Sequence, residues 1–351
     1  MWIISILILI LILGIIILVH EFGHFIWAKT FKVHIYEFSI GMGPVLLTHK
    51  GKDGVDYNLR AVPIGGFVSM AGEVYEDADT DEIPKEKFMC NRPWWQRLII
   101  LVAGVTNNFI LALILLFASA LIWGGNSLEP VVDNAISGYP MALAGIEAGD
   151  TILSINGVNT PTWDVAQIVL AMKNKNDYYT FKVEKQDGTI KEVNVTPKTE
   201  TLEDGTERSV FGIQIASTKL TGFGGAIKYA FVKFGSVVHS MWLTVTGLIT
   251  GKISLTALSG PVGMYQVVDE ARGIGISYLV YITAFLSINV GFINILPFPA
   301  FDGGRVFFLV VEKIKGSPVN AKFDNACHMV GFVLLLLLMV VITIQDIIRL
   351  F

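Results

Sequence analysis

The sequence predicts a polytopic α-helical membrane protein with about four transmembrane helices, a β-rich segment on one side of the membrane and a folded domain inserted on the other. Three observations predict this fold class. Hydrophobic residues make up 53% of the 351 residues and charged residues 16%, whereas soluble domains have roughly 45–50% and 25%. Several apolar runs reach the roughly 20 residues that a helix needs to cross a bilayer. One long stretch between them is polar and rich in turn residues.

Four segments are long and apolar enough to span a membrane. The first begins without a positively charged region and has no A-x-A-like cleavage site, so we expect a retained anchor rather than a signal peptide. The third is interrupted by Ser287, Asn289 and Asn294 but is still long enough to span. The expected transmembrane helices are residues 1–27, 98–123, 276–300 and 326–350.

Lysine and arginine residues near the spans predict the orientation of the chain, because they concentrate on the cytoplasmic side. They gather in residues 28–97 and 301–325, whereas Arg272 and Arg349 alone lie near a span on the opposite side. We therefore expect residues 28–97 and 301–325 to face the cytoplasm and the N-terminus to lie outside.

Residues 217–275 contain a further long and fairly apolar stretch, residues 226–250. Lys228, Lys233 and His239 interrupt it, which favours an amphipathic helix in the outer membrane interface over a span. An additional crossing here would invert the sidedness of every later segment.

Residues 124–216 have no long apolar run and predict a separate folded domain. The stretch AGIEAGDTILSINGVNT at 144–160 joins a turn to an alternating strand and an Asn156–Gly157 turn, and a hairpin is expected around Asp187–Gly188. The same stretch resembles the signature of PDZ domains. This resemblance implies an extracytoplasmic PDZ domain that could bind a peptide by strand addition. A β-rich domain that acts only as a bulky filter is the alternative.

The sequence HEFGH at 20–24 lies inside the first apolar segment. Ionisable groups in a membrane are costly, by about 2.5–3.5 kcal/mol each, and are therefore usually functional. His20 and His24 lie one turn apart on one helix face, and H-E-x-x-H is the pattern in which two imidazoles bind zinc and the glutamate acts as general base. We predict His20 and His24 as metal ligands and Glu21 as the catalytic base. Two buried histidines beside an incidental acid are the alternative.

Catalytic zinc sites usually have three protein ligands, so a third must come from elsewhere in the chain. Asp302 follows the third span in NILPFPAFDGGRV, where prolines and glycines break the helix. His20, His24 and Asp302 would all lie toward the cytoplasmic ends of spans that run in the same direction. We therefore predict Asp302 as the third ligand of Zn²⁺, the alternative being an acid that caps a turn.

These motifs resemble those of the site-2 proteases, intramembrane zinc metalloproteases, and specifically of their bacterial branch with an inserted PDZ domain. HEFGH matches the first family motif, and residues 294–303 match N-x-x-P-x-x-x-L-D-G with Phe301 in place of leucine. AGVTNNF at 103–109 resembles A-G-P-x-x-N-F with Val105 in place of proline. We expect the polar trio of this stretch to bond across helices rather than to contact substrate. The trio is Thr106, Asn107 and Asn108.

The resemblance implies a multi-pass enzyme of the bacterial cell membrane whose active site faces the cytoplasm. Its substrates would be single-span membrane proteins, such as anti-sigma factors or signal-peptide remnants, cut in regulated intramembrane proteolysis. It also implies that residues 28–97 form a membrane-associated β-sheet whose edge pairs with the extended substrate, and that Asn294 supports substrate or transition state. An ordinary hairpin packed under the helices is the alternative for residues 28–97.

The expected partners are single-span membrane substrates and the lipid bilayer. Nucleic acid is not expected, because a net charge of −4 gives no basic surface for it.

Two other functions would use the same residues less well. A metal-ion transporter would place polar groups across the midplane, and an idle PDZ-bearing scaffold would need no base at Glu21. The remaining histidines are expected outside the site: His34, His49, His239 and His328.

Overall fold

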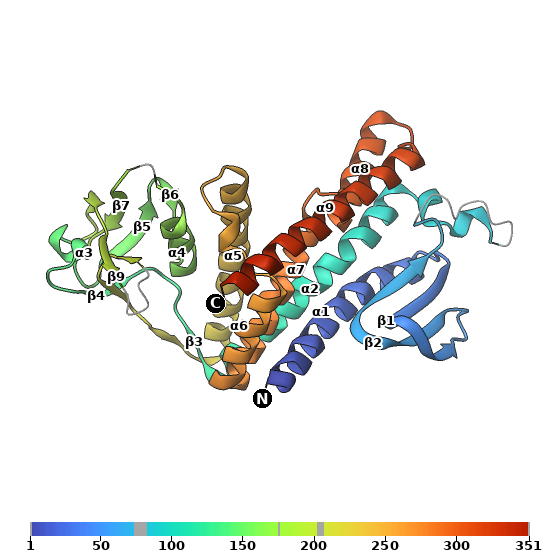
Figure 1. Ribbon diagram of the computed structural model, residues 1–351, viewed down its shortest axis with the longest axis horizontal. Coiled ribbons are helices and arrows are strands. Elements are labelled where there is room, and N and C mark those ends of the chain that lie inside the picture. The colour runs from blue at the N-terminus through green and yellow to red at the C-terminus, as the bar shows by residue number, and fades with distance from the viewer. Residues whose placement is uncertain (1, 74–82, 175, 202–206, 350–351) are drawn as a thin grey trace. The chain divides into compact units, whose positions relative to one another are not determined.

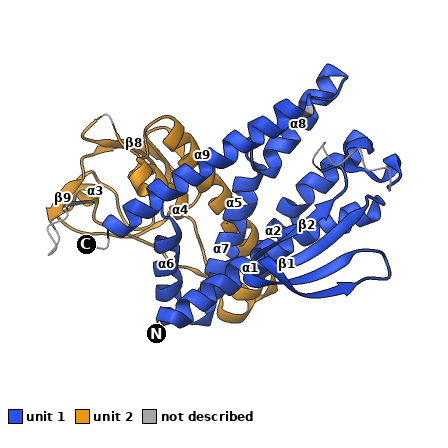
Figure 2. Cartoon of the chain, turned by 45° about the vertical axis from the view of Figure 1, so that its right-hand side comes forward, with its two compact units in different colours: residues 1–115, 258–351 blue, residues 116–257 orange. Residues whose placement is uncertain are grey.

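The computed structural model describes residues 2–73, 83–174, 176–201 and 207–349 (Figure 1). The chain divides into two compact units, which Figure 2 colours separately. One unit combines residues 1–115 with 258–351, and the other comprises residues 116–257.

The first unit consists of helices and one long β-hairpin. Its elements are α1 (Trp2–Thr30), β1 (Ile35–Lys50), β2 (Asp56–Met70), two short 3-10 helices (Lys85–Lys87 and Met89–Asn91), most of α2 (Trp94–Trp123), α6 (Pro261–Ile274), α7 (Ile276–Ile295), α8 (Asp302–Lys315) and α9 (Ala321–Ile348).

Five helices in the described chain are long and apolar enough to cross a membrane, so the chain is a multi-pass membrane protein. Four of them, α1, α2, α7 and α9, correspond to the predicted spans. The fifth is α5 (Gly222–Ile249), which the sequence predicts at the membrane surface instead. The predicted segment 217–275 contains two helices, α5 and α6.

Several helices begin or end at other residues than the predicted segments, for identifiable reasons. α7 ends at Ile295 and not at residue 300, because Pro297 and Pro299 cannot continue a helix. α2 begins at Trp94, directly after Pro93, which suits a helix start. Residues 301–325, predicted as a cytoplasmic connection, contain the amphipathic helix α8, which ends at Gly316 in the left-handed conformation.

The β1–β2 hairpin folds back on itself, which leaves one strand segment at its edge. Residues 35–40 pair on one side with residues 66–70 and on the other with residues 56–59, while residues 47–50 also pair with the latter. Among the described residues, 66–70 therefore have a partner strand on one side only. The hairpin packs under the C-terminal part of α1 around buried apolar side chains that include Phe38, Val68 and Ile100.

The link between α7 and α8 aims the start of α8 at the interior of the first unit. Ala300 adopts a positive φ of +83°, which turns the chain just before Asp302. Gly303 and Gly304 then lie against the backbone of the preceding link: a Cβ at Gly303 would be 2.2 Å from the Leu296 carbonyl oxygen. Both glycines are needed for this close approach, which fixes Asp302 at the first position of α8.

The second unit is mainly antiparallel. Its central sheet has the strand order β6-β5-β7-β8, and the turns expected at Asn156–Gly157 and Asp187–Gly188 are present, with positive φ at Asn156 and at both glycines. Its elements are β3 (Gly125–Asn126), β4 (Val132–Ala135), α3 (Pro140–Leu143), β5 (Thr151–Ile155), β6 (Val158–Asn159), α4 (Trp163–Ala171), β7 (Tyr179–Glu184), β8 (Ile190–Val195), β9 (Lys198–Thr201), β10 (Glu207–Val210), β11 (Ile213–Ile215), β12 (Lys219–Leu220), α5 and a 3-10 helix (Leu255–Ala257).

Helix α5 belongs to this second unit and packs on α4 through polar groups. The Lys233 ammonium lies 2.7 Å from Asp164 Oδ2, and the Ser236 hydroxyl donates to the same oxygen at 2.9 Å. Lys233 is buried. The unit therefore extends beyond the predicted 124–216 domain and includes a helix whose inner face depends on that domain for charge compensation.

Candidate metal centre

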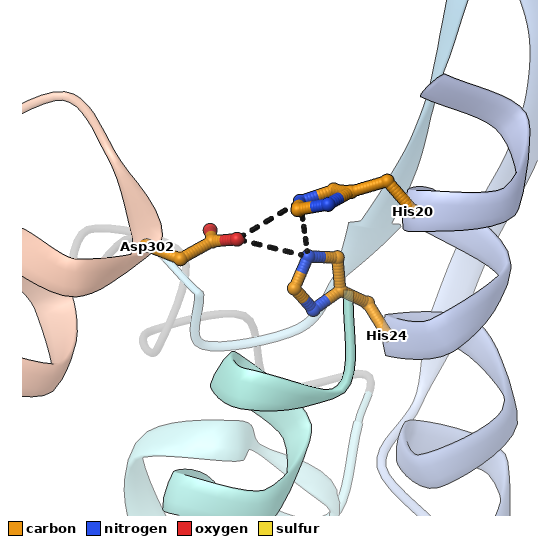
Figure 3. Close-up of side chains that lie close together, drawn as sticks. All are labelled: His20, His24 and Asp302. Atoms are coloured by element: carbon orange, nitrogen blue, oxygen red, sulfur yellow. Dashed lines mark hydrogen bonds and ion pairs between the residues drawn. The ribbon is translucent and has the colours of Figure 1, made fainter. Parts of the chain in front are cut away.

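The structure brings the three predicted ligands together, as Figure 3 shows. His20 Nε2 lies 2.9 Å from Asp302 Oδ2 and 3.2 Å from His24 Nε2, and His24 Nε2 lies 3.3 Å from the same carboxylate oxygen. Both histidines are 6% exposed. Two residues one turn apart on α1 and one residue at the start of α8 therefore converge on a single point.

A close crossing of α1 and α2 makes room for this convergence. A Cβ on Gly23 would lie 2.5 Å from the Ala103 carbonyl oxygen, so only glycine allows the two backbones to approach this closely. On the facing helix, a Cβ on Gly104 would lie 2.5 Å from His24 Nε2 and 2.7 Å from His20 Nε2. The missing side chain of Gly104 thus leaves a hollow beside the two nitrogen atoms.

The three donor atoms fit a zinc ion. Zinc ligands at about 2.0–2.1 Å in a tetrahedron lie about 3.3 Å from one another, close to the separations of 2.9, 3.2 and 3.3 Å here. His24 Nδ1 lies 2.7 Å from the Ile100 carbonyl oxygen, which can only accept, so Nδ1 carries the ring proton and Nε2 is free to bind a metal. Among the described residues, His20, His24 and Asp302 form the group with metal-binding geometry.

Asp302 is available as a carboxylate. Its burial opposes ionisation, but when the two imidazoles are protonated and no metal is bound, their hydrogen bonds to the carboxylate outweigh that effect and lower the pKa of Asp302 well below its usual range. An ionised carboxylate is the form that binds a metal ion.

Glu21 lines the cavity beside the ligands. The cavity has a volume of about 620 Å³ and also receives His24, Asp302 and Arg305. The carboxylate Oε2 of Glu21 accepts a hydrogen bond of 3.1 Å from the backbone N–H of Val68, in the edge segment of β2. The predicted base, two ligands and one strand edge therefore share one space that can admit a polypeptide.

Other predicted residues fall in different places. Asn294 is half-buried near the end of α7; it is not among the residues that line the cavity, and its side chain makes no hydrogen bond in the described part of the chain. Asn107 bonds across helices as expected, to the Val19 carbonyl, whereas Thr106 bonds to Val102 within its own helix. Asn108 also makes a cross-helix contact as expected, from α2 to His20 on α1.

One histidine that the sequence places outside the site lines the cavity. His328, on α9, accepts a hydrogen bond of 3.0 Å from the backbone N–H of Ala300, the residue with positive φ. His328 therefore braces the turn that precedes Asp302. In the sequence it shares no motif with Asp302, so only the fold reveals the contact.

The first unit is made of apolar helices, and it encloses a histidine pair, a carboxylate and a neighbouring glutamate at a cavity. This combination defines a membrane-embedded metallohydrolase. Comparisons with known proteins lead to the same class. The model of peptidase family M50 matches residues 8–338. A protein of Clostridium acetobutylicum is 36% identical over 345 residues, which cover 98% of this chain and 97% of the relative.

Two further relatives have informative names. The regulator of sigma-W protease RasP of Bacillus subtilis is 31% identical over 419 residues, covering 97% of this chain and 98% of the relative. The zinc metalloprotease RasP of Shouchella clausii is 29% identical over 425 residues, with the same coverage.

The chain belongs to peptidase family M50, the site-2 proteases, and is a zinc metalloprotease. The resemblance, the enzyme class and the zinc cofactor that the sequence predicts are confirmed. The transporter and the idle scaffold are excluded as main readings by the same finding.

Proposed function

We propose that this protease hydrolyses peptide bonds of single-span membrane proteins within or near the membrane, with His20, His24 and Asp302 as zinc ligands and Glu21 as general base. The observation that carries the proposal is the convergence of the three donor atoms at the wall of a cavity that Glu21, His24 and Asp302 line. The RasP relative of Bacillus subtilis is named for the regulation of sigma-W, which fits anti-sigma factors as one substrate class.

The chemistry follows from the groups that meet at the cavity. A zinc ion held by the three ligands would activate a water molecule and polarise the scissile carbonyl. Glu21 accepts a proton from the attacking water, whose oxygen bonds to the carbonyl carbon. Glu21 then delivers that proton to the leaving nitrogen as the C–N bond breaks. The Val68 N–H donates to Oε2 of the Glu21 carboxylate, so Oε1 is the oxygen that would take part in proton transfer.

The edge segment of β2 gives the substrate a place to unwind. A membrane helix satisfies its peptide groups internally, so a protease must replace those hydrogen bonds when it extends the substrate. Residues 66–70 have one partner strand and carry Val68 beside Glu21. An extended substrate that adds a strand at this edge passes directly in front of the base. Asn294 would bond the substrate backbone from the end of α7.

The proposed orientation places residues 28–97 and 301–325 in the cytoplasm and the inserted domain outside, in a bacterial cell membrane. Helix α5 would lie on the outer surface and not across the bilayer. Its inner face carries Lys233, buried against Asp164, and its opposite face exposes Phe231 and Trp242. A polar domain along one face and aromatic residues along the other suit a helix at the interface.

The inserted domain would screen substrates, either by adding a peptide strand as a PDZ domain does or by excluding large outer domains. Its antiparallel sheet and Asn156–Gly157 turn support the PDZ assignment. Addition of a labelled C-terminal peptide to the purified protein distinguishes the two, because only the first predicts saturable binding.

Purified protein in detergent should cleave a model single-span peptide, lose activity with a zinc chelator and recover it when zinc is returned. Glu21→Gln keeps size and hydrogen bonding but cannot accept the proton, so turnover should fall about 10²–10⁴-fold with zinc still bound. Full activity of Glu21→Gln would refute the assignment of the base. Cleavage that does not depend on zinc would refute the proposal as a whole.

A further inference from the structure

Asn108 is a fully buried polar residue in the middle of α2, and it touches a predicted metal ligand. Its side chain is 0% exposed, and its amide Nδ2 lies 3.3 Å from His20 Nδ1. Its backbone carbonyl also accepts a hydrogen bond of 2.8 Å from the Ser287 hydroxyl on α7. Asn108 therefore stands where α1, α2 and α7 meet, on the side of His20 that faces away from Asp302.

The position of the proton on the His20 ring determines which hydrogen-bonding group Asn108 must offer. Nε2 of His20 faces Asp302 and His24 Nε2, so Nε2 is the nitrogen that would bind a metal ion. A neutral imidazole whose Nε2 lone pair is given to a metal carries its proton on Nδ1. That buried N–H needs an acceptor, since an unpaired buried donor costs about 1–3 kcal/mol.

The Asn108 amide can supply this acceptor. Its Oδ1 atom is buried and has no hydrogen-bond partner in the described part of the chain. A 180° rotation about the Cβ–Cγ bond exchanges Oδ1 and Nδ2, which brings Oδ1 to His20 Nδ1 and breaks no hydrogen bond of Oδ1. His24 already has the equivalent partner, because its Nδ1 donates to the Ile100 carbonyl.

We infer that Asn108 is a positioning residue of the zinc site: its amide oxygen accepts the His20 Nδ1–H and so fixes the tautomer and ring orientation in which Nε2 binds the metal. This inference rests on the proposed ligand set. It assigns each of the two histidines its own acceptor on α2, a backbone carbonyl for His24 and a side-chain amide for His20. Such outer partners typically contribute a factor of 10–100 in metal affinity.

Zinc affinity, measured by competition with a chromophoric chelator, tests the inference without any need for turnover. Asn108→Leu keeps the volume but has no acceptor, so affinity should fall about 10–100-fold. Asn108→Asp keeps an acceptor at the same position and should bind zinc at least as tightly as the wild type. Asn107→Leu is the matched control: it removes a neighbouring amide that bonds to the Val19 backbone carbonyl and to no ligand side chain, and should leave affinity unchanged.

Two reference proteins, the wild type and His20→Ala, distinguish failure of this inference from failure of the proposed function. Wild-type protein that binds no zinc, or His20→Ala that binds it normally, would refute the ligand set itself. With those references in order, three results overturn the role of Asn108: wild-type affinity in Asn108→Leu, an equal loss in Asn107→Leu, or an equal loss in Asn108→Asp. If Asn108→Leu does not give folded protein by gel filtration, Asn108→Ala replaces it, with the same expected loss. The absorption spectrum of the cobalt-substituted protein should change in Asn108→Leu or Asn108→Ala and not in Asn108→Asp.

Discussion

The Glu21 carboxylate accepts a hydrogen bond from the Val68 backbone N–H across a distance of 3.1 Å. Residues 66–70 have one partner strand, so this N–H points away from the sheet ladder and toward α1. The predicted base is therefore held by the same strand edge that we propose for substrate binding. A substrate strand at this edge would therefore lie beside Glu21.

Val68→Pro should remove the hydrogen bond that holds the base. Proline lacks the N–H, and an outward-facing N–H on an edge strand is where proline is tolerated. Loss of a hydrogen bond to a charged group costs about 1.5–3 kcal/mol, so we expect turnover to fall at least about tenfold with zinc content intact. Val68→Ala is the control, because it trims the side chain and keeps the N–H. Equal turnover in the two variants would show that this hydrogen bond does not orient the base.

Gly104→Ala should prevent metal binding without removing any ligand. The added Cβ would lie 2.5 Å from His24 Nε2 and 2.7 Å from His20 Nε2, which is closer than real Cβ atoms come. We expect zinc affinity to fall at least about 100-fold. This is the upper end of the loss that follows removal of a hydrogen-bond partner of a metal ligand. Gly14→Ala adds the same methyl group to α1, where the nearest atom is the Pro63 carbonyl oxygen at 3.4 Å, and should bind zinc normally. Normal zinc binding by Gly104→Ala would mean that the ion lies elsewhere.

The local part of the site could be predicted because it depends on one helix. His20 and His24 are one turn apart in any α-helix, so their shared face follows from sequence spacing alone. Asp302 is remote in the sequence, yet the requirement of zinc for a third ligand and the expected membrane depth of the candidates were sufficient to select it. The structure places its carboxylate 2.9 Å from His20.

The parts that could not be predicted depend on how helices are rotated against one another. Gly104, Asn108 and His328 touch the site only because α2 and α9 present particular faces to it. A single sequence gives the period of a helix but not which neighbour each face meets. In the sequence, Asn108 is a polar residue in an apolar span. This indicates that its side chain has a hydrogen-bonding partner but does not identify that partner.

Cysteine-accessibility labelling tests the proposed sidedness. The native thiols Cys90 and Cys327 are first replaced by serine, and single cysteines are then introduced at Asp187 and Lys315. Because basic residues concentrate on the cytoplasmic side, an impermeant reagent added to intact cells should label position 187 and not position 315. Labelling of both positions from the same side would mean that α5 crosses the membrane, and the assignment of Asp302 to the cytoplasmic half would then fail.

Asp302→Asn is the sharpest test of the third ligand. An amide is nearly isosteric with the carboxylate but is a much poorer zinc ligand, so zinc affinity should drop markedly and activity should return in part at high added zinc. Asp324→Asn is the matched control, because Asp324 is the second aspartate that lines the same cavity and lies 3.6 Å from His328, away from the three converging atoms. It should keep wild-type zinc affinity, measured by the same chelator competition. If Asp302→Asn retains full zinc occupancy and near-normal cleavage, its carboxylate is not a ligand, and the third position must be sought among the remaining polar groups at that depth, beginning with Asn294.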